Sequence, residues 1–187
     1  MEERRRPTEG DLVWLIDQGR NWVVRQHAKY HPIATPLSDP LKGLLSPFFD
    51  PATLNVARCC SVPVIENPSF RAEAIARGLV QPDAMNFTKM DGVTFQDTFL
   101  VSQAKQLSNA EVNALIFHEL VHVAQYAALG VDEIVTRYAR GLAGGRGDYY
   151  AIPLELVAYT LQVRFMTGSE SEFSVEEFVQ KTVGLRY

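Results

Sequence analysis

The chain has 187 residues, 47% of them hydrophobic, and its 18 basic and 22 acidic residues give a net charge of −4. This length and composition suit one globular domain with a substantial core. The acidic balance argues against a protein that coats nucleic acid or an anionic membrane. The sequence contains no run of 18 apolar residues, so a membrane span is not expected.

Residues 1–50 are predicted to form an N-terminal helical wrap. The three arginines at 4–6 lack the apolar segment that an export signal needs, and residues 11–30 carry apolar side chains at helical spacing. His27 and His31 are four residues apart, but Pro32 disfavours helical geometry at His31. We therefore expect two surface histidines here rather than a second metal site, followed by short helical turns and a proline-rich loop.

Residues 51–167 are predicted to form the core. Apolar residues alternate with other residues near Leu54 and again near Val62, which predicts one or two strands. The second should lie at a sheet edge, because Pro63 has no amide proton to donate to a neighbouring strand. A short helix should end at Gly78, and extended patterns at 85–88 and 92–101 predict a small antiparallel sheet. An edge strand of such a sheet could bind an extended peptide, although a covered edge is the alternative.

The two cysteines, Cys59 and Cys60, are adjacent, so they cannot form a disulfide framework. With no export signal in the sequence, we expect the protein to be cytoplasmic.

Residues 108–130 are predicted to form the helix that contains two candidate metal ligands and the candidate catalytic base. Ser108 and Glu111 form a capping box, and Gly130 provides a left-handed stop. Within it, residues 118–122 read HELVH, which places His118 and His122 one turn apart on one face, where both imidazoles can reach one metal ion. Glu119 is rotated by about 100° from His118, so it can act on water without being a ligand.

The remaining segments complete an α+β fold. A helix should follow from residue 131 to 140, then a glycine-rich loop at 141–147, a helix with Pro153 in its first turn that ends before Gly168, and a C-terminal helix within 168–187. The whole chain is predicted to be a single domain, with a small antiparallel sheet packed on a helical core.

A catalytic zinc normally has three protein ligands, so a third must be found. No histidine follows His122 in the sequence, which leaves a carboxylate on a later helix. Glu155 is the best candidate, because Ala158 on the same face allows close helix packing. The competing carboxylates are Asp132, Glu133 and Asp148, all near helix starts where capping explains them.

Two segments together resemble the gluzincin group of bacterial zinc metallopeptidases: HELVHVAQY at 118–126 and YYAIPLELVAY at 149–159. The resemblance covers about residues 50–160. It implies a zincin-like fold with the HELVH helix at the cleft, a zinc ion held by His118, His122 and Glu155, and Glu119 as general base. Better-known gluzincins carry an aspartate at the position of Tyr159, so Gln125, Glu111 or main-chain carbonyls are expected to orient the histidines instead.

The predicted function is zinc-dependent hydrolysis of peptide bonds in a peptide or protein substrate, with no nucleic-acid or membrane partner. Zinc would activate a water whose proton Glu119 accepts. Tyr149 is the predicted donor to the developing oxyanion, with Arg146 and Tyr150 as alternatives. The rival functions are a zinc-stabilised binding module that hydrolyses nothing and a DNA-binding regulator, which the acidic charge disfavours.

Overall fold

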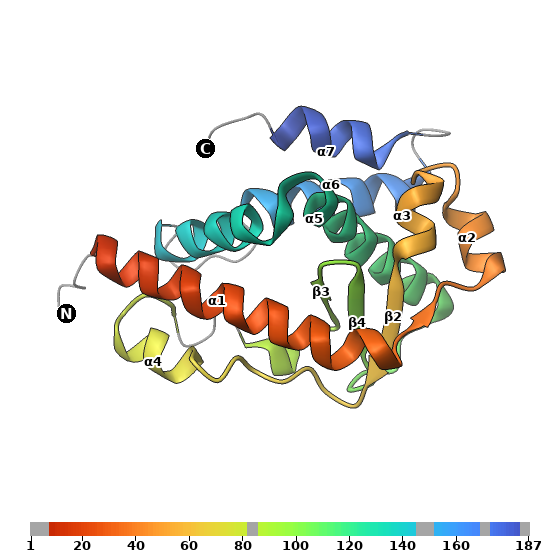
Figure 1. Ribbon diagram of the computed structural model, residues 1–187. Coiled ribbons are helices and arrows are strands. Elements are labelled where there is room, and N and C mark those ends of the chain that lie inside the picture. Colours follow the sequence, from red (N-terminus) through yellow and green to blue (C-terminus); the bar gives the residue numbers. More distant parts are fainter. Residues whose placement is uncertain (1–7, 82–85, 145–151, 169–172, 184–187) are drawn as a thin grey trace.

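A computed structural model describes residues 8–81, 86–144, 152–168 and 173–183, and shows a mostly helical α+β fold around a small four-stranded sheet (Figure 1). The α+β class is therefore confirmed. The helices are α1 (Glu9–Tyr30), α2 (Asp39–Leu45), α3 (Pro51–Val56), α4 (Arg71–Ala76), α5 (Asn109–Gly144), α6 (Pro153–Thr167) and α7 (Val175–Val183). The strands are β1 (Thr35–Pro36), β2 (Arg58–Val62), β3 (Gly92–Phe95) and β4 (Thr98–Ser102), and 3-10 turns lie at η1 (His31–Ile33) and η2 (Phe87–Lys89).

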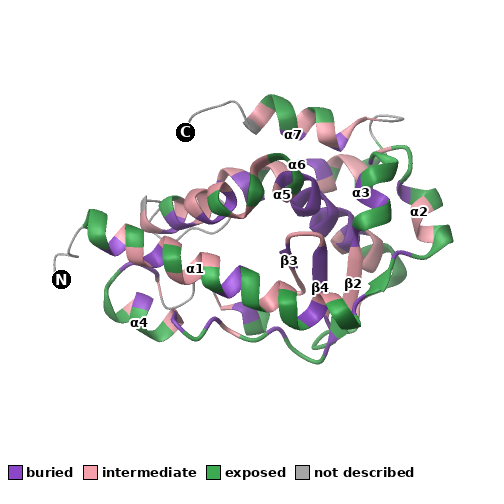
Figure 2. Cartoon of the chain, viewed as in Figure 1, coloured by how far each residue is buried: buried purple, intermediate pink, exposed green. Residues whose placement is uncertain are grey.

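Helix α5 is the element against which α1, α6, α7 and β3 pack. Its first turn is capped as predicted: Glu111 Oε2 accepts hydrogen bonds from Ser108 N at 2.8 Å and Ser108 Oγ at 2.7 Å. Gly130 has φ 73° and breaks the helix, but the chain re-enters helical geometry at once, because glycine adopts this conformation without a Cβ clash. The middle of α5 and strand β4 are buried (Figure 2).

The sheet has the strand order β1-β2-β4-β3 and is mixed, which corrects the expectation of an antiparallel sheet. Strands β3 and β4 form the expected antiparallel hairpin, but β2 and β4 are parallel. After α4 the chain enters β3 in the direction opposite to β2, and the tight turn into β4 reverses it again, so β4 runs parallel to β2. The hairpin turn lies at Gln96 and Asp97, inside the predicted extended segment at 92–101, and Gln96 takes φ 62°.

The expectation of a strand around Leu54 is wrong, because residues 51–56 form α3. Pro51 occupies its first turn, where a missing amide proton costs nothing. The start of α3 is capped from far along the chain: Glu176 Oε1 accepts from Asp50 N at 3.1 Å and from Thr53 Oγ1 at 2.6 Å. Strand β2 begins only at Arg58 and is paired on both sides, so it is not an edge strand.

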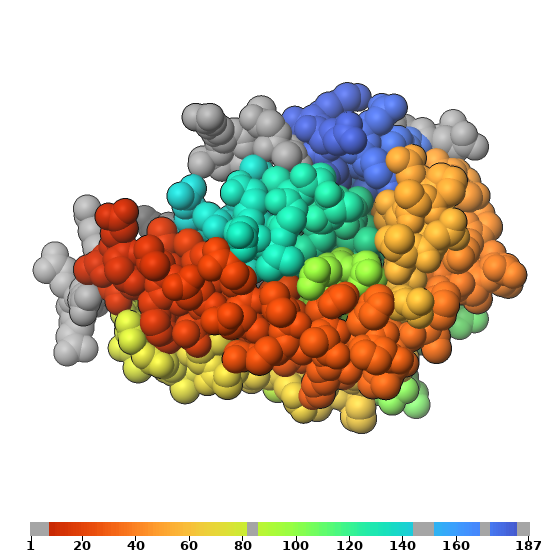
Figure 3. Space-filling model, in the orientation of Figure 1, coloured from red at the N-terminus to blue at the C-terminus, as the bar shows by residue number. Residues whose placement is uncertain are grey.

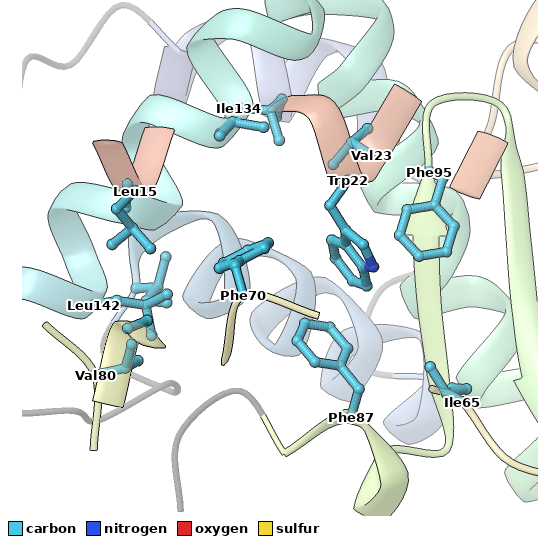
Figure 4. Packing of buried hydrophobic residues seen from close by; sticks show 14 of the residues in the cluster. Leu15, Trp22, Val23, Ile65, Phe70, Val80, Phe87, Phe95, Ile134 and Leu142 are labelled. Carbon is cyan, nitrogen blue, oxygen red and sulfur yellow. The ribbon is translucent and has the colours of Figure 1, made fainter. Parts of the chain in front are cut away.

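Two apolar clusters meet at α5. The first lies between α1, the α4 region, β3 and the second half of α5 (Figure 4), where the Trp22 ring packs 4.9 Å from Phe95 and 4.8 Å from Phe87. The second joins α2, α3, α6 and α7 to the first half of α5, and Phe117 stacks on Phe165 at 4.5 Å. The site described below lies on the α5 surface that faces the first cluster.

The segment Asn109–Ala143 within α5 is long enough and, by mean hydropathy, apolar enough to cross a membrane. It contains no uninterrupted run of 18 apolar residues. In the fold, 61% of its most apolar window is buried against other elements. A core helix of a folded domain has the same composition, so this is weak evidence for a span.

Candidate metal centre

Three buried side chains that could bind a metal ion converge between α5 and α6. His118 and His122 point their Nε2 atoms at each other across 3.1 Å. Glu155, in the first turn of α6, places Oε2 3.4 Å from His118 Nε2 and Oε1 3.5 Å from His122 Nε2. All three residues are 6% exposed or less.

The separations between these donor atoms fit one small cation. Zinc binds imidazole nitrogen and carboxylate oxygen at about 2.0–2.2 Å, so tetrahedral ligands lie about 3.3–3.6 Å apart. The three observed separations, from 3.1 to 3.5 Å, match these edges closely. Three protein ligands would leave a fourth position open, which is the pattern of catalytic rather than structural zinc sites.

Two glutamines orient the imidazoles. His122 Nδ1 lies 2.8 Å from Gln125 Oε1, and Gln125 Nε2 donates to Leu154 O at 3.0 Å. His118 Nδ1 lies 3.2 Å from Gln162 Oε1. Because an amide oxygen can only accept, both Nδ1 atoms carry a proton, so both Nε2 atoms are directed at the cluster, where a bound cation would take their lone pairs.

Glu155 is held by the ring hydroxyl of Tyr138, which donates to its Oε1 at 2.5 Å. Burial would raise the pKa of Glu155, but the charge of His122 and hydrogen bonds from both histidines hold this pKa well below its usual range. Burial alone would lower the pKa of His122, but Glu155 raises it to about 9. The metal-free cluster therefore retains a proton at neutral pH, and a bound cation would replace that proton.

Glu119 lies beside this cluster in a site of its own. Thr94 Oγ1 on β3 lies 2.7 Å from Glu119 Oε2 and 3.1 Å from Glu119 O. Gly92 leaves the space that the carboxylate occupies, since a Cβ there would stand 2.3 Å from Glu119 Oε1. Burial raises the pKa of Glu119 against the opposing effects of His118 and His122, and a cation at the cluster would lower it again.

The cluster and Glu119 open onto a cavity of about 560 Å³. Its polar end carries His118, Glu119, His122 and Glu155, with Tyr159 beside them. Apolar side chains from α1, the α4 region, β3 and the second half of α5 form much of the remaining wall, and the charged residues Lys89, Asp91, Lys105 and Glu111 also line it. The cavity can therefore bind an apolar group of a ligand beside the polar cluster.

The structure brings His118, His122 and Glu155 together, as the sequence predicted. Asp132 instead lies 2.5 Å from Arg20 Nε, and Glu133 pairs with Arg137. Glu111 caps its own helix, so it does not orient the histidines. The predicted oxyanion donor Tyr149 and its alternatives Arg146 and Tyr150, with the competing ligand Asp148, lie outside the described residues.

The sequence analysis missed three polar groups of the site, Thr94, Tyr138 and Gln162. Gln162 follows Glu155 by seven residues, two helical turns, so its place on the same face of α6 was readable from spacing. Tyr138 offered no such signal, because its contact depends on how the second half of α5 crosses α6. Comparisons of the chain with protein-family models, curated proteins and solved structures found no match.

Proposed function

We propose that the protein is a zinc-dependent hydrolase of peptide bonds, of the gluzincin type. The observation that carries the proposal is one arrangement: two imidazoles and a carboxylate at tetrahedral spacing, with a second, non-ligating carboxylate beside them at the end of a cavity. Two nitrogens and one oxygen form a ligand set typical of catalytic zinc. When bound there, zinc would act as a Lewis acid that acidifies water and polarises a carbonyl.

In this proposal Glu119 is the general base. It accepts the proton of the attacking water and passes it to the leaving amine. The carboxylate is buried between the Thr94 hydroxyl and the space left by the missing Cβ of Gly92. This position supports the role, because a carboxylate that is already held in place does not have to be oriented when the substrate binds. Tyr149 stays our proposed donor to the oxyanion.

Strand β3 supports a peptide as the substrate. On one side β3 pairs with β4, and no described strand pairs with its other side. An extended peptide could add there through main-chain hydrogen bonds, which would carry its scissile bond past Glu119. The apolar wall of the cavity favours a bulky apolar side chain next to that bond.

The Glu119→Gln variant tests the proposal. We expect it to keep the zinc content of the parent protein, measured by elemental analysis, while cleavage of a mixed peptide library, followed by mass spectrometry, falls by at least about 100-fold. Glu133→Gln is the matched control, because Glu133 lies on the same helix but pairs with Arg137 away from the cavity.

The rival function is a zinc-stabilised binding module. The low exposure of all three candidate ligands is compatible with it, and zinc content would not separate the two functions because both bind the ion. Zinc binding without any cleavage by the parent protein, or equal cleavage by the parent and Glu119→Gln, would support this rival over the hydrolase.

A further inference from the structure

A second group of metal-ligating side chains lies away from the cavity. His27 Nε2 and His31 Nδ1 lie 2.8 Å and 3.2 Å from the same oxygen, Oδ1 of Asp97. The two imidazole rings are 4.7 Å apart and tilted by only 34°. The expectation that Pro32 moves His31 out of helical geometry is wrong, because His31 has φ −54° and ψ −41°. The two histidines therefore lie one turn apart on one face.

The carboxylate is held in place by the β3–β4 turn. Gln96 takes a left-handed conformation, Arg58 N donates to Asp97 O at 2.9 Å, and Thr98 Oγ1 donates to Asp97 Oδ1 at 3.0 Å. The contacts of this carboxylate with described residues all fall on Oδ1, so Oδ2 is available for a further ligand. Part of the hairpin reaches the surface between α1 and α5 (Figure 3).

We propose that His27, His31 and Asp97 form a second binding site, for a divalent transition-metal ion such as Zn²⁺. Two imidazole nitrogens and one carboxylate oxygen suit zinc, cobalt, nickel or copper, whereas calcium and magnesium prefer all-oxygen sites. The side chains are 24%, 36% and 34% exposed. An ion can therefore enter from solvent, and water can complete its coordination.

Such an ion would join two walls of the cavity. His27 lies in the last turn of α1 and His31 follows this helix, whose residues Leu15 and Trp22 line the cavity. Asp97 follows β3, the strand on which Thr94 contacts Glu119. The contact between Trp22 and Phe95 already holds these elements together, and the ion would add a polar clamp at their exposed end. The site does not depend on the proposed hydrolase activity.

The histidine content of the chain makes a direct test feasible. Only four histidines exist, two in each group, so side-chain ¹⁵N resonances of the full chain report each site separately. On titration with Zn²⁺ alone, we expect the His27 and His31 signals to change in a saturable way at constant pH. The double variant His27→Gln/His31→Gln should bind one zinc per chain fewer than the parent in equilibrium dialysis.

Lys29→Gln is the matched control, because Lys29 lies between the two histidines but points to Glu66. It should bind as much zinc as the parent. The proposal is overturned if the double variant, shown to be folded by circular dichroism, keeps the zinc content of the parent. It is also overturned if the His27 and His31 signals respond to pH but not to zinc, since the group is then a histidine–aspartate ion pair only. A failure of the first site would remove zinc response from His118 and His122 instead, so the two results are distinguishable.

Discussion

The substitution Gly92→Ala would test the position of the proposed base without altering any charged group. A Cβ at residue 92 would stand 2.3 Å from Glu119 Oε1, 2.8 Å from Cδ and 3.0 Å from Cγ. Ordinary contact distances for such atoms are about 3.5 Å, so the carboxylate must move by roughly 1 Å. Glu119 is only 3% exposed, so it cannot escape into solvent, and the move would stretch its 2.7 Å contact with Thr94.

The expected loss follows from this displacement. A misplacement of about 1 Å in a catalytic group costs about 100-fold in rate, and the weakened hydrogen bond to a charged group costs about 1.5–3 kcal/mol of stability. We therefore expect kcat/KM for peptide cleavage to fall about 100-fold and the urea midpoint to fall. Zinc content should stay unchanged, because the three atoms nearest to a Cβ at residue 92 all belong to Glu119, which is not a candidate ligand.

Gly43→Ala is the matched control, because a Cβ at residue 43 meets nothing within 4 Å and Gly43 lies in α2, away from the cavity. It should leave cleavage unchanged and stabilise the helix slightly. If Gly92→Ala cleaves peptides as fast as the parent, Glu119 does not act from the position described above, and the assignment of Glu119 as general base is wrong.

Three further predictions concern the metal-free protein, the histidine partner and the C-terminal helix. The pKa of His122 is raised from 6.5 to about 9, so its ion pair with Glu155 stabilises the metal-free fold fully below pH 6.5, and this stabilisation is lost as pH rises through 9. Urea unfolding in EDTA should therefore show that the free energy of unfolding falls by at most about 3 kcal/mol over this pH range. A free energy of unfolding that does not change with pH would contradict the ion pair. Gln125→Ala should weaken zinc binding 10- to 100-fold in a competition titration with a chromophoric chelator, because His122 loses its hydrogen-bond acceptor; unchanged affinity would show that Gln125 does not orient the ring. Glu176→Ala removes the cap of α3 and should cost about 1–2 kcal/mol in urea unfolding, whereas Glu177→Ala, at an exposed neighbouring position, should cost less than half of that.

Local signals in the sequence were sufficient to predict the helix that carries the candidate site. The Ser108 capping box begins α5 as predicted, Gly130 breaks it, and Gly168 ends α6 in a left-handed conformation. Each signal depends on groups within three or four residues, so no knowledge of the fold is required. The four-residue spacing of His118 and His122 belongs to the same class, since helical periodicity alone places both on one face.

The sequence could propose Glu155 as a partner but could not place it, because its approach to the histidines depends on the packing of α6 across α5. Only the fold sets Gly92 and Thr94 against Glu119, about 25 residues later, and only the fold brings Asp97 to the end of α1. The mixed sheet has the same origin, since strand direction is decided by the path of the connecting chain. Such contacts join side chains that no local periodicity relates, so tertiary structure alone decides them.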